Sequence, residues 1–237
     1  SFTEGSNVDA DIIIKSFDGD GNPTSSEVQV NTTSYHTQLA SEIAKLSDGN
    51  YVVVWEAHNG QDGDGIGVFA QILNQNLAKI GSEFQINQNT AGNQHFIQLE
   101  ALPGGKFVVG HWDLNANKLV GTTFNNDGSN AGHFDIASGA TNDDLAGDYG
   151  DHYWHGKMEI TASDSGGFLV TWGEDDVVRG GVGNDIFGQH FDQDGQKLGS
   201  AFQINQLHDE HQHQPSVVKV DGGYFVAFTS GKLGPTG

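Results

Sequence analysis

Short apolar runs recur along the chain, and each follows a turn that contains glycine. The runs are residues 52–55, 107–109, 168–172 and 224–228. The Asp-Gly and Gly-Gly pairs before them suit tight hairpin turns that require a positive φ. We therefore predict β-hairpins at residues 42–57, 98–113, 158–173 and 216–230. Because a strand that is apolar on both faces is buried on both faces, the second strand of each hairpin should form the core.

A second kind of hairpin alternates with the first. Its copies are residues 11–31, 66–87, 119–137 and 186–205, and two of them end in Phe-Gln-Ile-Asn. Their alternating polar and apolar positions predict half-exposed strands. The two kinds of hairpin together form one domain, residues 1–237, with approximate repeats at 11–65, 66–117, 118–185 and 186–237.

Four strands in each repeat predict an all-β fold, a β-propeller of four-stranded antiparallel blades. The chain begins with a hairpin of the second kind and ends with one of the first kind. If a blade joins a hairpin of the first kind to the next one of the second kind, both chain ends supply the last blade. We therefore predict a four-bladed ring in which residues 11–31 pair with residues 216–230. A slice of a larger ring is the alternative.

Charge limits the partners of this chain. The formal net charge is -21, from 31 acidic and 10 basic residues, so nucleic acid and anionic membranes are disfavoured and cations are attracted. The sequence has no cysteine and no apolar run near the roughly 20 residues that span a bilayer. This composition suits a bacterial secreted protein or a cytosolic one, and we expect a mature form or fragment of a longer protein.

Three segments of the first two repeats carry a family resemblance. Residues 48–55, 60–71 and 81–87 resemble the tandem repeat of hemolysin-type (RTX-like) calcium-binding surface proteins and adhesins of bacteria. The resemblance implies secretion or a cell-surface location, bound calcium and an adhesive role, and it does not imply an enzyme. The RTX nonapeptide pattern occurs once, at residues 180–185, and one copy does not build a calcium-loaded roll.

Acidic turns are the candidate calcium sites. Carboxylate and amide oxygens alternate in them as in calcium loops, although Gln29 stands where the first of them would need a bidentate glutamate. The candidate ligands are Asp18, Asp20 and Asn22 in a hairpin turn, and Asp62, Asp64, Asp113, Asn115, Asn117, Asp175, Asp176 and Asp185 in the loops between repeats. The alternative is that these residues shape turns or solvate the surface.

Histidine and aromatic residues mark two other candidate sites. The run His208, His211 and His213, with carboxylates between them, suits zinc or another transition metal; an exposed polar loop is the alternative. An insertion in the third repeat contains Tyr149, Asp151, His152, Tyr153, Trp154 and His155. Aromatic faces beside carboxylates suit a glycan or a protein partner, and the alternative is a cap over the core.

Catalytic motifs do not stand out in the sequence. There is no nucleophile elbow, phosphate-binding glycine loop or zinc-protease motif, and no pair of carboxylates is preferred over the others. The prediction is therefore a non-enzymatic, calcium-stabilised extracellular binding or adhesion module that recognises a glycan or a cell-surface protein through its face loops. A structural assembly unit that associates with itself, and a propeller hydrolase that acts on polysaccharide, are the alternatives.

Overall fold

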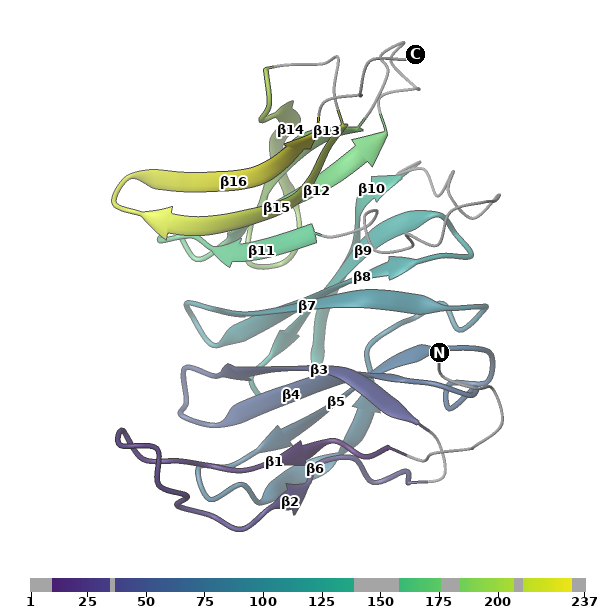
Figure 1. The fold of residues 1–237 in the computed structure, drawn as a ribbon, viewed down its shortest axis with the longest axis vertical. Helices are drawn as coiled ribbons and strands as arrows, with labels where there is room; N and C mark the ends of the chain where they lie inside the picture. The colour runs from purple at the N-terminus through teal and green to yellow at the C-terminus, as the bar shows by residue number, and fades with distance from the viewer. Residues whose placement is uncertain (1–9, 35–36, 139–157, 176–183, 207–210, 232–237) are drawn as a thin grey trace.

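The fold is built from β-strands throughout its described part. The computed structural model describes residues 10–34, 37–138, 158–175, 184–206 and 211–231 (Figure 1). Sixteen strands and no helix lie in these ranges, so no helix there could cross a membrane. The predicted all-β class is confirmed.

Twelve of the strands form three four-stranded antiparallel sheets, which we call blades 1 to 3. Blade 1 contains β3 (Gln38–Lys45), β4 (Tyr51–Ala57), β5 (Gly67–Leu73) and β6 (Lys79–Gln85). Blade 2 contains β7 (Gln94–Leu102), β8 (Lys106–Asp113), β9 (Lys118–Asn125) and β10 (Asn130–Ser138). Blade 3 contains β11 (Met158–Ala162), β12 (Phe168–Asp175), β13 (Asn184–Phe191) and β14 (Lys197–Gln203). Each blade joins the two predicted kinds of hairpin in the predicted order.

The two ends of the described chain form half-blades. The N-terminal half-blade is β1 (Ile13–Ile14) with β2 (Val28–Gln29), and the C-terminal half-blade is β15 (His211–Val220) with β16 (Gly223–Gly231). They are separate two-stranded sheets at opposite ends of the stack of blades (Figure 1). The predicted pairing of residues 11–31 with residues 216–230 is therefore wrong for this structure. The three intact blades lie between the two half-blades and keep them apart (Figure 1).

The hydrophobic core lies between consecutive blades. Between blades 1 and 2, Val52 and Val54 pack with Phe107 and Phe124, whose rings stack with centroids 5.1 Å apart. A second cluster joins blades 2 and 3, and a third joins the N-terminal half-blade to blade 1. As predicted, β4 and β8 are almost wholly buried. However, β5 is also fully buried, so the predicted exposure applies to the outer strands of the three blades, β6, β10 and β14. The burial predicted for the second strands is wrong for β16, whose residues are half-buried or exposed.

The first strands of the blades lie on the side where the blades converge. There β3 packs on β7, β7 on β11 and β11 on β15, one above another in Figure 1. Three of these strands contain a bulge, with non-glycine residues at positive φ: Ala40 (50°), Phe96 (56°) and Gln214 (55°). A bulge redirects the strand and the side chains next to it. The convergent side is therefore where unusual backbone and side-chain geometry is concentrated.

A repeated asparagine explains the Phe-Gln-Ile-Asn motif. The side-chain oxygen of Asn87 accepts the N–H of Val68 at 2.9 Å, and its amide donates to Gln94 and Asp62 at 3.0 and 2.8 Å. Asn205 makes the matching bonds in the next copy, with Ile186, Gln212 and Asp185. Asn31 binds Ile12 and Asp11 in the same way. Because a buried polar group is stable only when it is hydrogen-bonded, the motif fixes the end of each hairpin of the second kind.

Candidate active site

The acidic residues between repeats hold loop backbone and asparagines. Asp62 accepts a bond from Asn87, and Asp64 accepts the N–H of Gly92 at 3.0 Å. Asp113 is buried and accepts bonds from Asn89 and from the N–H of Ala116. Asp185, also buried, accepts a bond from Asn205. These carboxylates thus have partners within the protein.

The other predicted metal ligands are dispersed. Asp18 accepts the backbone N–H groups of Asp20 and Asn22 in a hairpin turn, and bonding to Asn22 lowers the pKa of Asp18. Asn115 lies beside Gly92, and Asn117 has a positive φ of 52°. His211 and His213 lie in β15. Within the described ranges, no three carboxylate or imidazole side chains converge as a metal site requires. Several predicted residues lie outside the described residues: Tyr149, Asp151, His152, Tyr153, Trp154, His155, Asp176 and His208, together with the side chains of Asp175 and His211.

Asp62 offers a direct test of the calcium prediction. Replacing Asp62 by alanine removes its bond to Asn87, and we expect a loss of about 1 kcal/mol of unfolding free energy in the presence of chelator. If calcium also binds there, added calcium should raise the melting temperature of the wild type but not of Asp62→Ala. Thermal melts of both proteins with chelator, calcium and zinc make the measurement. An unchanged Asp62→Ala melt in chelator would contradict the structural role.

One position in the second strands of the three intact blades belongs to the core. Trp55 and Trp172 are buried there, and His111 takes the same place in blade 2. Burial lowers the pKa of His111 to about 4, against the opposing charge of Asp113. His111 is thus a neutral core residue, and none of these side chains lines a ligand channel.

Glu42 lies on the convergent side of the blades, in the first strand of blade 1. Its two carboxyl oxygens face blade 2: Oε2 accepts the N–H of Leu99 at 2.6 Å, and Oε1 accepts the side-chain amide of Gln98 at 3.1 Å. Burial raises the pKa of Glu42 to about 7, the Leu99 bond opposes the rise, and the negative charge of Glu159 adds to it. Close to neutral pH this carboxyl group therefore holds a proton for much of the time.

Gln98, whose amide donates to Glu42, also lines a small cavity formed by residues of β7 and β11. The cavity has a volume of about 140 Å³ and is lined by Phe96, Ile97, Gln98, Met158 and Glu159. Glu42, Gln98 and Glu159 occupy equivalent positions in three successive first strands, since they stand opposite Val54, Gly110 and Thr171 in the second strands. The row therefore places a protonated carboxyl group and a second glutamate on either side of an amide, next to an open space.

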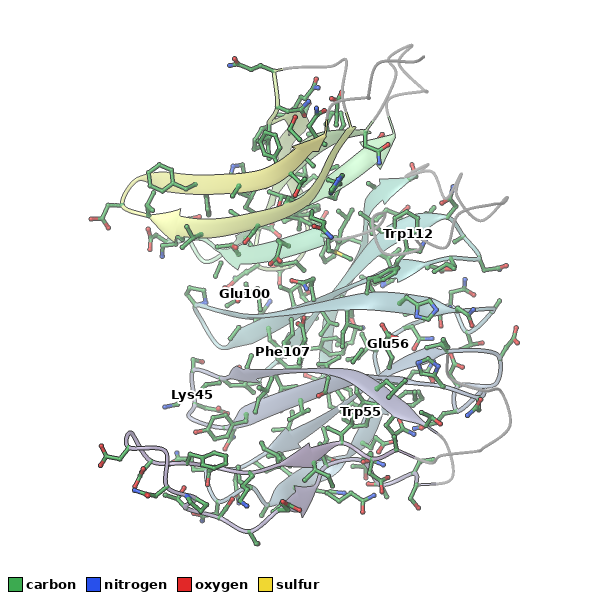
Figure 2. The ribbon with its side chains drawn as sticks, viewed as in Figure 1. Lys45, Trp55, Glu56, Glu100, Phe107 and Trp112 are labelled. Atoms are coloured by element: carbon green, nitrogen blue, oxygen red, sulfur yellow. The ribbon has the colours of Figure 1, made fainter. Side chains whose placement is uncertain are left out.

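Glu100 provides a comparison for Glu42. It also faces the next blade, where its Oε1 accepts the N–H of Ala162 at 3.0 Å, and burial raises its pKa against that bond. Figure 2 shows it between β7 and β11. No second carboxylate contributes to the pKa shift of Glu100. A half-buried glutamate that binds the neighbouring first strand is thus a structural element of this fold. Its place in a row with Glu159 distinguishes Glu42.

Glu56 anchors the bulge of β7. It is 7% exposed and lies between β4 and β7 (Figure 2). Its Oε1 accepts the N–H of Phe96 at 2.8 Å, and its Oε2 lies 3.1 Å from His95 Nδ1 and 3.7 Å from His58 Nε2. Burial opposes ionisation, but the bonds from the two histidines and Phe96 outweigh it and lower the pKa of Glu56 to about 2. This anionic group holds Phe96, a wall of the cavity, in its positive-φ conformation.

Charge removal at Glu42 should stabilise the protein at alkaline pH. The folded pKa of about 7 exceeds the ordinary value of 4.5, so the folded state binds more protons than the unfolded state between these values. The unfolding free energy contributed by Glu42 is complete below pH 4.5 and is lost as pH rises through 7. Allowing for solvent screening, we expect the unfolding free energy of Glu42→Gln to exceed that of the wild type by about 2 kcal/mol at pH 8.5 and to equal it at pH 4. Urea unfolding at both pH values measures this, and parallel profiles would contradict it.

Sequence inspection missed Glu42, Glu56 and Glu159. Glu42 and Glu159 stand at the same place in their repeats, so aligning the first strands could have found them together with Gln98. Glu56 had no such signal, because Trp112 and Gly173 stand at its position in blades 2 and 3.

Comparisons with known proteins show the fold. No family model matches the chain, and no curated protein matches it. It is similar to a protein of unknown function from Dyadobacter fermentans, with a TM-score of 0.58 and 9% identity, covering 86% of this chain and 65% of that one. It is also similar to an α-L-arabinanase from Penicillium chrysogenum, complexed with arabinobiose, with a TM-score of 0.56 and 14% identity. This match covers 83% of this chain and 58% of that one. The match to an α-L-arabinofuranosidase from Fusarium graminearum has a TM-score of 0.52 and 13% identity, and it covers 84% of this chain and 59% of that one.

These similarities correct the functional prediction. The chain spans less than two thirds of the length of each of these three structures, and the shared feature is the propeller-like arrangement of blades. Two of the three are glycan-cleaving enzymes. These similarities contradict the prediction of a non-enzymatic adhesion module, and the missing motifs do not support the conclusion that the chain is not an enzyme. A fold does not by itself fix a function, so the function has to be argued from the site.

Proposed function

We propose that this chain forms part of a propeller-type glycoside hydrolase, in which Glu42 is the general acid and Glu159 is the second carboxylate. The observation that carries the proposal is the row Glu42, Gln98 and Glu159 beside the cavity, with Glu42 protonated near neutral pH. Glycoside hydrolysis needs one carboxyl group that donates a proton to the leaving oxygen and one that stays ionised.

The different environments of Glu42 and Glu159 suit them to the two roles. Glu42 is half-buried against blade 2 and interacts with a like charge, and both effects favour its neutral, proton-donating form. Glu159 lines the cavity itself, where an ionised carboxylate could activate water or attack the sugar. Gln98, which both binds Glu42 and lines the cavity, would position the acid and hydrogen-bond a sugar hydroxyl.

Glycan is accordingly the proposed partner, as a substrate. The similar folds of an arabinanase and an arabinofuranosidase support arabinose-containing polysaccharides as the first to try. The described residues that line the cavity include one carboxylate and one amide but no cation, which favours a neutral glycan over an acidic one. Secretion, which the sequence predicts, would place the protein where such polysaccharides are found.

A substrate screen tests the proposal. Purified protein is incubated with arabinan, other neutral polysaccharides and an acidic polysaccharide, and new reducing ends are measured over time. We expect release from at least one neutral polysaccharide, with more activity at pH 5–6 than at pH 8.5 because the acid must be protonated. An absence of release from every substrate would contradict the proposal.

A further inference from the structure

Phe96, in the first strand of blade 2, combines two unfavourable features. It adopts a positive φ of 56°, in the left-handed region that residues with large side chains rarely occupy, and it is 39% exposed. Backbone strain of this kind persists only where the surrounding structure enforces it, and it is concentrated at functional sites. Because this strained and exposed ring also lines the cavity beside Gln98 and Glu159, it indicates a role other than folding.

The fold does not require an aromatic residue at this position. The same bulge occurs in β3 and β15, where Ala40 and Gln214 stand in place of Phe96 with φ angles of 50° and 55°. Ala40 is exposed as well. A methyl group is therefore sufficient for the bulge, and of these three described bulges only the one in β7 carries a ring.

The backbone of Phe96 is held in place from blade 1. Glu56 Oε1 accepts the N–H of Phe96 at 2.8 Å, and Glu56 Oε2 lies 3.1 Å from His95 Nδ1. The ring of His95 lies beside that of Phe96, with centroids 5.8 Å apart. Burial opposes ionisation of Glu56, but the bonds from His58, His95 and Phe96 lower its pKa to about 2, so this anchor is charged at neutral pH. A segment that is ordered before a ligand arrives loses little entropy when the ligand binds.

The cavity next to Phe96 offers the groups that a sugar ring needs. Its lining combines the amide of Gln98 and the carboxylate of Glu159 with the apolar side chains of Phe96, Ile97 and Met158. A sugar has a face of C–H groups, which packs on the face of an aromatic ring, and hydroxyl groups at its edge, which bind amides and carboxylates. The net charge of -21 disfavours an acidic ligand.

We propose that Phe96 is the platform on which a neutral sugar ring stacks, and that it is the residue that selects glycans at this cavity. The inference deepens the proposed function and rests on it for the identity of the site. Stacking itself needs no bond cleavage, so binding and hydrolysis can be measured separately.

Calorimetric titration tests the platform. Neutral oligosaccharides of arabinose, xylose, glucose and mannose are titrated into Glu42→Gln, a background chosen so that hydrolysis does not consume the ligand. We expect at least one of them to bind, and we expect Phe96→Ala in that background to raise its Kd about tenfold or more. Phe96→Tyr keeps the ring, so its Kd should stay within about threefold. An anionic oligosaccharide of galacturonic acid should bind about tenfold more weakly than the neutral one.

Two further variants control for folding. Phe202 is 43% exposed and lies on β14, which is separated from β11 by β12 and β13, so Phe202→Ala should leave the Kd within about twofold. Phe96→Gly removes the ring and also relieves the positive φ. Its melting temperature should equal or exceed that of Phe96→Ala, while its binding should be lost to the same extent.

The outcomes separate this inference from the hydrolase proposal. Binding that depends on Phe96, without hydrolysis of any glycan, would support the platform and contradict the hydrolase. Hydrolysis with an unchanged KM in Phe96→Ala would do the reverse. No binding of any neutral oligosaccharide, or an equal loss of binding in Phe202→Ala, would overturn the platform.

Discussion

Replacing Glu42 by glutamine is expected to lower the rate of glycan hydrolysis by a factor of about 10² to 10⁴, the usual contribution of a general acid. Glutamine has nearly the same shape, and its side-chain oxygen can still accept the N–H of Leu99. It cannot donate a proton to the leaving oxygen. The rate is measured on the substrate that the wild type cleaves best, with KM determined for both proteins so that loss of binding is separated from loss of chemistry.

Glu100→Gln is the matched control for this variant. Glu100 has a similar environment, with burial, a raised pKa and a bond to the next first strand, but it lies outside the row formed with Glu159. Its replacement should leave the rate within a few-fold of wild type. Equal losses in the two variants would mean that Glu42 acts only through the packing of the blades. A substrate whose leaving group needs no protonation should restore much of the rate of Glu42→Gln.

Removal of Glu56 should cause the largest loss of stability. Glu56→Ala leaves the N–H of Phe96 and the ring of His95 without their buried acceptor, and Phe96 keeps a positive φ that is unfavourable for an aromatic residue. We expect a loss of about 3 kcal/mol at pH 7, measured by urea unfolding. Because the folded pKa lies near 2, below the ordinary 4.5, the contribution is present above pH 4.5 and is lost as pH falls toward 2.

Glu56→Gln separates the hydrogen bond from the charge. Glutamine can still accept the N–H of Phe96 but attracts the histidines less. The loss of unfolding free energy in Glu56→Gln should therefore be about half of that in Glu56→Ala. Glu56→Gln should also lack the acid-dependent part of the wild-type profile. A loss below about 1 kcal/mol for Glu56→Ala would show instead that packing, and not the carboxylate, holds the bulge of β7.

The repeated pattern in the sequence was sufficient to predict the blades. The hairpins predicted at residues 98–113 and 66–87 correspond to β7 with β8 and β5 with β6, and the Gly-containing turns adopt the expected positive φ, as at Gly49 (87°). The first strands extend further toward the N-terminus than predicted, to Gln38 and Gln94. The bulges at Ala40 and Phe96 allow this extension, and an irregular backbone leaves no periodic signal.

Closure of the ring could not be read from the sequence. The same hairpins occur in a closed four-bladed ring and in a slice of a larger ring, so the repeat pattern alone does not distinguish the two. The resemblance to RTX-like surface proteins and the calcium and zinc sites stay predictions, as does the insertion at residues 149–155. What the acidic pattern did not reveal is that Asp62, Asp113 and Asp185 bind asparagines, because bonds to residues distant in sequence depend on tertiary structure.

The pH dependence of kcat/KM of the wild type tests the catalytic role of Glu42 most directly. If Glu42 donates the proton, activity should fall above an apparent pKa near 7, the value that burial and Glu159 give its carboxyl group. Removing the like charge with Glu159→Asn should also move the stability profile of Glu42 toward lower pH. We expect an alkaline limb near 7 that is absent from the residual activity of Glu42→Gln. A limb that persists unchanged in Glu42→Gln would contradict proton donation by this residue.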